Sequence, residues 1–147
     1  VRLMLVADGK ILYKTLEITR LGEGLASCGE LQPAAIDRSA KAVANFYARA
    51  KSDGAEIVCA FATAAVRSAS NGQAFLSAVR SLCGLEVEVI SGEEEAEIGV
   101  LGALRGADGG IIDIGGASTE IIVQKSESVA KIAAKLPSFT NCFFTIE

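Results

Sequence analysis

The sequence predicts an α/β fold built on a mixed sheet with flanking helices. Three observations lead to this class: an apolar hairpin opens the chain, strands and helices then alternate, and a second strand-turn-strand lies at residues 111–123. Half of the 147 residues are hydrophobic, which is enough to bury one core of ordinary domain size.

The first element is a β-hairpin over residues 1–19. Its two apolar runs, 1–7 and 11–19, flank an Asp8-Gly9-Lys10 turn in which Gly9 supplies the positive φ of a tight hairpin. The chain starts on the first strand without a methionine, so we expect that a preceding segment is missing.

An amphipathic helix follows. It starts at Pro33, a residue suited to the first helical turn, and Gly54 is a plausible stop. Apolar residues recur between them at helical spacing, namely at Ile36, Ala40, Val43, Ala44 and Tyr47.

The middle of the chain continues the alternation. We expect a strand at 57–62, a loop at 63–68, and a helix that runs from an Asn71 cap to Gly84. A strand LEVEVI at 85–90 completes a β-α-β-α-β order, which is typical of a parallel α/β layer.

The next helix has a readable start. Ser91 is a candidate N-cap, and Glu94 three residues later completes a capping box. Glu95 is not needed for the cap, and helical spacing places Gly99 and Gly102 on its side of the helix. Either the glycines let the helix pack closely while Glu95 points at water, or Glu95 is available for chemistry. The helix dipole also attracts acidic residues that have no catalytic role.

Two carboxylates, Asp113 and Glu120, lie within the otherwise apolar segment IIDIGGASTEIIV at 111–123. An unpartnered carboxylate taken out of water costs several kcal/mol or more. We therefore expect both groups to lie in a cleft or to pair with a cation.

The turn between them can bind phosphate. Gly115 and Gly116 let the backbone approach a ligand closely, and the hydroxyls of Ser118 and Thr119 add donors. Asp113, just before the turn, is placed to hold a hydrated Mg²⁺ at that phosphate. A tight hairpin that uses the glycines for geometry explains the turn equally well.

A weak internal repeat relates the two hairpins. Setting Thr119 over Val1 aligns TEIIVQKSESVAKI with VRLMLVADGKILYK, and both read as an apolar strand, a polar turn and a return strand. A chance match is the alternative. If the repeat is real, an Asp-x-Gly loop precedes the first copy.

The composition of the chain argues against several classes of function and partner. The net charge of −4 comes without a basic stripe, which argues against a nucleic-acid partner. No apolar run approaches the roughly 20 residues of a membrane span and no signal segment opens the chain, so we expect a cytoplasmic protein without a membrane partner. The four cysteines lack C-x-x-C spacing and there is no histidine, which disfavours zinc and excludes histidine-based catalysis. If the protein is an enzyme, its general base is then a carboxylate, and a lysine is the less favoured alternative.

Three ordered motifs, ATAAVR (62–67), VISGEEEA (89–96) and IIDIGGASTE (111–120), resemble the exopolyphosphatase and guanosine pentaphosphate phosphatase (Ppx/GppA) family. RLGEGL at 20–25 fits the same family, and the resemblance runs from residue 1 to about residue 124. It implies the duplicated actin-like ATPase (ribonuclease H-like) fold, in which phosphate loops from two lobes face each other across a cleft.

The resemblance also implies a role for each site residue. Glu95 would be the general base that activates the attacking water. Arg67 would contact substrate phosphates, although a lone arginine after a strand is more often a surface ion pair. Asp113 would orient Mg²⁺, and Glu120 would complete the polar cluster. The second phosphate loop would consist of Gly115, Gly116 and Ser118.

The chain departs from the family pattern in two places. Ala117 stands where a third glycine is usual, and the first phosphate loop, expected before Val1, is absent. The tail at 136–147 also follows the pattern poorly. We therefore expect a first lobe at 1–106 without its first phosphate loop and an incomplete second lobe at 107–147, in a fragment or truncated form.

The leading hypothesis is a Mg²⁺-dependent phosphoanhydride hydrolase that releases terminal phosphate from inorganic polyphosphate or guanosine pentaphosphate. The alternative is a non-catalytic phosphate- or nucleotide-binding module, or an inactive truncated form, which the missing first loop favours. A third hypothesis, a kinase or ATPase of the same fold, is weaker, because such an enzyme needs an adenosine pocket from the absent part of the second lobe. The preferred polyphosphate and the oligomeric state are left open, and a homodimer is one option.

Overall fold

The computed structural model describes residues 1–104, 109–114, 119–124 and 141–146, with side chains as far as residue 104. The elements, in chain order, are β1 (Arg2–Ala7), β2 (Lys10–Leu16), α1 (Leu25–Cys28), α2 (Pro33–Ser52), β3 (Ile57–Ala62), α3 (Ala64–Ser68), α4 (Gly72–Cys83), β4 (Glu88–Val89), α5 (Gly92–Leu104), β5 (Gly109–Ile114), β6 (Thr119–Gln124) and β7 (Asn141–Ile146).

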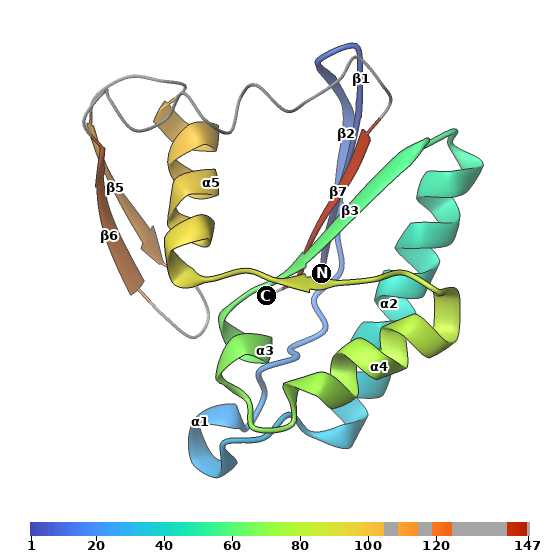
Figure 1. The fold of residues 1–147 in the computed structure, drawn as a ribbon, viewed down its shortest axis with the longest axis vertical. Helices are drawn as coiled ribbons and strands as arrows, with labels where there is room; N and C mark the ends of the chain where they lie inside the picture. Colours follow the sequence, from blue (N-terminus) through green and yellow to red (C-terminus); the bar gives the residue numbers. More distant parts are fainter. Residues whose placement is uncertain (105–108, 115–118, 125–140, 147) are drawn as a thin grey trace.

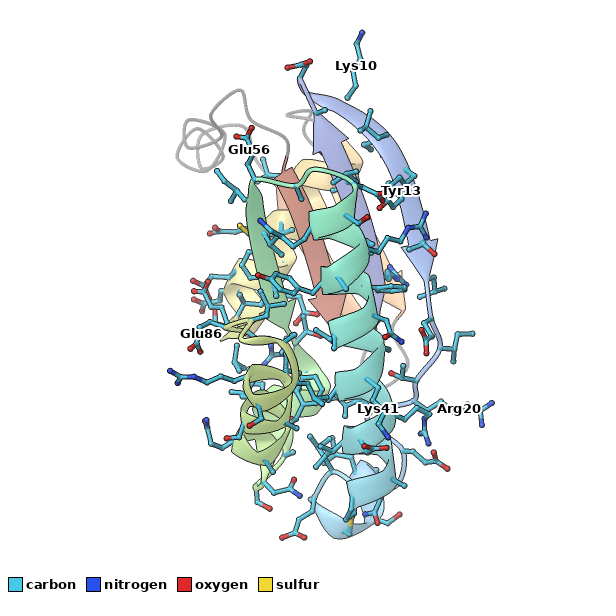
Figure 2. All side chains as sticks on the ribbon, turned by 90° about the vertical axis from the view of Figure 1, so that its right-hand side faces the viewer. Lys10, Tyr13, Arg20, Lys41, Glu56 and Glu86 are labelled. Atoms are coloured by element: carbon cyan, nitrogen blue, oxygen red, sulfur yellow. The ribbon has the colours of Figure 1, made fainter. Side chains whose placement is uncertain are left out.

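These elements form two sheets. The larger has five strands in the order β2-β1-β7-β3-β4, and the smaller pairs β5 with β6 (Figure 1). Figure 2 shows α2 and α4 in front of the larger sheet, with β3, β7 and β1 behind them. The α/β class with a mixed sheet is therefore confirmed.

The opening hairpin is confirmed as β1 and β2, which pair antiparallel. Its turn residues Asp8 and Gly9 have φ values of 50° and 71°. Two successive positive φ values are typical of the two-residue turn whose twist matches that of the flanking strands. Aspartate tolerates this conformation better than most residues, and glycine adopts it without strain.

The core lies between the larger sheet and the two long helices. Leu3 and Leu5 of β1 are almost fully buried together with Val43 of α2 and with Phe75 and Val79 of α4. The start of α2 at Pro33 is confirmed, and Gly54 follows it with a φ of 86°. Helix α2 thus presents its apolar stripe to the sheet as its spacing predicted.

A second set of contacts ties α2 to the edge strand β2. The Arg49 guanidinium lies 4.5 Å from the centroid of the Tyr13 ring. The Tyr13 hydroxyl donates a hydrogen bond of 2.5 Å to Asp53, at the end of the same helix. Figure 2 shows Tyr13 on the edge of the molecule beside α2.

Two local predictions were wrong. The loop expected at 63–68 contains the short helix α3, which begins where the backbone N–H groups of Val66 and Arg67 donate to the Thr63 carbonyl. Ala, Val and Arg without a glycine or proline can complete such a turn. Asn71 precedes α4 but does not cap it, because its side-chain amide bonds instead to the backbone N–H and carbonyl of Leu31.

The strand expected at 85–90 is shorter than predicted. Only Glu88 and Val89 pair with β3, in parallel, although Leu85 and Ile90 are also buried. The apolar alternation indicates burial, and Leu85 is buried without pairing with β3.

The second hairpin is confirmed as the antiparallel pair β5 and β6. The return strand that the repeat predicts after residue 124 lies outside the described residues. Strand β7 was not predicted at all. No helix in the described part of the chain is long and apolar enough to cross a lipid bilayer.

Candidate active site

Arg67 lies in the last turn of α3, directly after strand β3. Its Nη1 donates to two acceptors: the Ile90 carbonyl at 2.8 Å and Oε2 of Glu95 at 3.1 Å. The two charged side chains are mostly shielded from solvent, with 31% of Arg67 and 25% of Glu95 exposed. The structure thus joins residues that are 28 positions apart in the sequence.

The parallel pairing of β3 with β4 explains this meeting. Phe61 and Ala62 pair with Glu88 and Val89, and the Ile90 N–H then donates to the Ala62 carbonyl at 3.1 Å. The segments that follow two neighbouring parallel strands emerge at the same edge of the sheet, which is where α/β proteins commonly bind ligands. Helices α3 and α5 both begin at this edge.

The capping box at the start of α5 is confirmed. The Ser91 N–H donates to Oε2 of Glu94 at 2.8 Å, and the Glu94 N–H donates to the Ser91 hydroxyl at 3.1 Å. These bonds, above all the one from the Ser91 backbone, lower the pKa of the Glu94 carboxyl from its ordinary value. Glu94 therefore has a structural role, as its position three residues after Ser91 predicted.

Glu95 has different surroundings from its neighbour. Its backbone N–H donates to the Ser91 carbonyl at 3.0 Å, while its side chain turns to Arg67. An added Cβ at Gly99 or Gly102 would meet no described atom within 4 Å. Glu95 therefore does not simply point at water, because its carboxylate pairs with Arg67.

Asp113 and Glu120 occupy directly opposite positions in the register of β5 and β6. Both strands lie against α5, the helix that carries Glu95. Figure 1 shows strands β5 and β6 beside α5. The side chains of Asp113 and Glu120, and the whole of Gly115, Gly116 and Ser118, lie outside the described residues.

Carboxylate oxygens are ligands of the kind that a hard cation such as Mg²⁺ prefers. In the part of the chain whose side chains are described, no group of three or more His, Cys, Asp or Glu residues could hold a metal. Mg²⁺ is usually bound through only one or two carboxylates, together with water and substrate phosphates. The register pair of Asp113 and Glu120 supplies carboxylates of this kind.

Sequence reasoning missed the Ile90 carbonyl, which accepts a hydrogen bond from Arg67 as Glu95 does. A backbone acceptor has no residue signature. The nearest available signal was the position of Ile90 between a strand and a helix cap.

The model of the Ppx/GppA phosphatase family matches residues 5–136 of this chain. Among curated proteins, the chain is 40% identical over 116 residues to a guanosine-5'-triphosphate,3'-diphosphate pyrophosphatase of Photobacterium profundum. That match covers 76% of this chain and 23% of the relative. It is also 33% identical over 135 residues to exopolyphosphatase 2 of Mycobacterium tuberculosis, covering 85% of this chain and 42% of the relative.

Solved structures agree with these matches. A Ppx/GppA family member from Aquifex aeolicus is 34% identical with a TM-score of 0.68, over 85% of this chain and 44% of that one. An exopolyphosphatase from Cytophaga hutchinsonii is 31% identical with a TM-score of 0.73, over 81% of this chain and 40% of that one. The chain therefore spans less than half the length of these relatives.

Proposed function

This chain belongs to the Ppx/GppA phosphatase family and has its actin-like ATPase fold, and we propose that it carries the catalytic carboxylate of a phosphoanhydride hydrolase. The proposed reaction is the release of terminal phosphate from inorganic polyphosphate or guanosine pentaphosphate in the cytoplasm. The names of the relatives, exopolyphosphatase and guanosine-5'-triphosphate,3'-diphosphate pyrophosphatase, support this substrate class.

The contact between Arg67 and Glu95 is the observation that carries the proposal. It places a cation and a carboxylate at the edge of the sheet where the segments after β3 and β4 meet. Both groups are partly shielded from water, so each interacts more strongly with a bound charge than a fully exposed side chain would. An arginine and a carboxylate held in this way suit phosphate binding and water activation.

We assign a separate task to each side chain. The planar guanidinium of Arg67 offers five N–H donors, so it can bind phosphate oxygens while Nη1 keeps its backbone acceptor. The Glu95 carboxylate orients a water molecule and accepts its proton as the water attacks the terminal phosphorus. Positioning and charge neutralisation supply most of the catalysis in such reactions, and a carboxylate base adds typically 10² to 10⁴-fold.

The hairpin of β5 and β6 supplies the rest of the proposed site. Asp113 would hold Mg²⁺, with Glu120 opposite it in the register. When bound, Mg²⁺ neutralises charge on the phosphate oxygens. The backbone N–H groups of Gly115 and Gly116 and the Ser118 hydroxyl would surround the phosphate.

A phosphate-release assay beside a binding titration tests the proposal. Both use polyphosphate and guanosine pentaphosphate, with Mg²⁺ present and then removed by a chelator. Release that needs Mg²⁺ supports the hydrolase. Binding without release supports the second candidate, a phosphate-binding module. A chain that neither binds these compounds nor releases phosphate from them would contradict both candidates.

A further inference from the structure

Helix α5 begins at Gly92, directly beside the guanidinium of Arg67. A Cβ atom added at Gly92 would meet Nη2 of Arg67 at 3.8 Å, and no other described atom would lie within 4 Å of it. The hydrogen bonds of this guanidinium to the Ile90 carbonyl and to Glu95 are both donated by Nη1. In the part of the chain whose side chains are described, Nη2 therefore has no acceptor, and the space beside it is the space that a side chain at residue 92 would fill.

Neither the backbone nor the described packing requires glycine at this position. Gly92 belongs to α5 and its φ is not positive, so other residues can adopt the same conformation. The residue is exposed, and 3.8 Å is an ordinary van der Waals distance. Glycine is, after proline, the least favourable residue in a helix. The missing side chain thus weakens the helix, and its effect in the described structure is to leave Nη2 uncovered.

The two terminal nitrogens of Arg67 are therefore in different situations. Nη1 is held by the Ile90 carbonyl at 2.8 Å and by Oε2 of Glu95 at 3.1 Å. Because the guanidinium is planar and rigid, these two contacts also fix the direction in which Nη2 points. A phosphate that approaches past Gly92 can accept a hydrogen bond from Nη2 while Glu95 keeps its contact with Nη1.

We propose that Gly92 determines access to the candidate site, because its missing side chain keeps Nη2 of Arg67 open to the terminal phosphate of a phosphoanhydride. This inference rests on the proposed function, which supplies the phosphate as the ligand. A larger side chain at residue 92 would cover Nη2 and leave the contact between Nη1 and Glu95 in place. The phosphate would then lose one charge-assisted hydrogen bond.

Chemical labelling tests the opening without any substrate. Phenylglyoxal, which modifies arginine guanidinium groups, is applied to the unaltered protein, to Gly92→Ala and to Gly92→Leu, and each arginine is followed by mass spectrometry of peptides. We expect the rate at Arg67 to fall severalfold in Gly92→Leu and by less in Gly92→Ala. Arg80, with 71% of its side chain exposed, is the internal control and should react equally in all three proteins. Equal rates at Arg67 in the unaltered protein and in Gly92→Leu would overturn the proposal.

A double-mutant cycle tests whether phosphate uses this opening. The probe is methylenediphosphonate, a non-hydrolysable analogue of a terminal phosphoanhydride, titrated by calorimetry in the presence of Mg²⁺. Gly92→Leu should weaken its binding about tenfold or more, as expected for the loss of one hydrogen bond to a charged group. In the Arg67→Ala background, Gly92→Leu should have no further effect. Equal weakening in both backgrounds would mean that leucine acts elsewhere, and would overturn the proposal.

Folding is checked separately in urea denaturation. Leucine is a better helix former than glycine, so the unfolding free energy of Gly92→Leu should be unchanged or higher. If it is lower, leucine disturbs the fold. Gly92→Ala, whose methyl group would meet Nη2 at an ordinary contact distance, then decides between the same outcomes.

The two measurements together distinguish this inference from the proposed function. Slower labelling of Arg67 in Gly92→Leu, with no binding of the analogue by the unaltered protein, would support the opening and contradict the proposed function. Equal binding of the analogue by the unaltered protein and by Gly92→Leu would overturn the inference about Gly92 and leave the proposed function standing.

Discussion

The contact between Arg67 and Glu95 can be measured as a coupling free energy, independently of any activity. Each residue is replaced by alanine, singly and together, and the free energy of unfolding of the four proteins is obtained from urea denaturation. The difference between the double variant and the sum of the single variants gives the pairwise energy.

The structure sets the expected size of this coupling. Two unit charges 3.1 Å apart attract by about 5 kcal/mol at an effective dielectric constant of about 20. Desolvation and the ordering of two long side chains offset most of this, and exposed pairs retain only about 0.2 to 1 kcal/mol. Because about a quarter to a third of each side chain is exposed, we expect a coupling of about 1 kcal/mol. Arg67→Ala should destabilise more than Glu95→Ala, because the Ile90 carbonyl also loses its donor.

The ion pair of Lys41 and Asp37 is a control within the same protein. Its atoms are closer, at 2.7 Å, but 63% and 62% of the two side chains are exposed. Solvent screening should therefore reduce its coupling to about 0.3 to 0.5 kcal/mol despite the shorter distance. A coupling between Arg67 and Glu95 no larger than that of this pair would refute the view that the site is shielded.

Three further predictions concern stability. Ser91→Ala should destabilise the protein by about 1 kcal/mol in urea denaturation, because α5 loses its N-cap. The lowered pKa of Glu94 means that its contribution to stability is present above the unfolded pKa and is lost as the pH falls through the folded pKa. Glu94→Gln should therefore show a smaller loss of stability on acidification, and an unchanged acid profile would count against the assigned hydrogen bonds. Tyr13→Phe should cost about 1 kcal/mol, because Asp53 loses a hydroxyl donor, and a thermal midpoint equal to that of the unaltered protein would show that this bond does not tie β2 to α2.

Local signals predicted much of the fold. Pro33 at the start of α2, the turn at Gly9 and the capping box at Ser91 depend on residues within one or two turns of chain, and each was confirmed. The class and family followed from the order of such signals and of the motifs.

The errors arose where distant residues decide the structure. Asn71 was read as a cap because of its neighbours, but its amide meets Leu31, 40 positions away. Strand β4 pairs with β3 only at Phe61 and Ala62, and the alternation in residues 85–90 does not encode this register. Strand β7 depends on pairing with both β1 and β3, so no local pattern could place it.

In the candidate site, too, local features were predictable and long-range contacts were not. The capping box, which lies within one helical turn, distinguished the structural role of Glu94 from the free carboxylate of Glu95 that meets Arg67. The meeting of Glu95 with Arg67 is a long-range contact, which only the family resemblance had indicated. The roles of Asp113, Glu120 and the loop between them stay predictions.

The most direct measurement of the central claim is steady-state phosphate release by the whole protein and by two adjacent variants. Glu95→Gln keeps the size of the side chain and can still accept a hydrogen bond from Arg67, but it cannot take the proton of the attacking water. We predict that it loses about 10² to 10⁴-fold in turnover while polyphosphate binding is largely retained. Glu94→Gln should release phosphate at nearly the unaltered rate, because glutamine also serves in a capping box. Near-normal turnover in Glu95→Gln together with a dead Glu94→Gln would contradict the account, since the base and the cap would then be reversed.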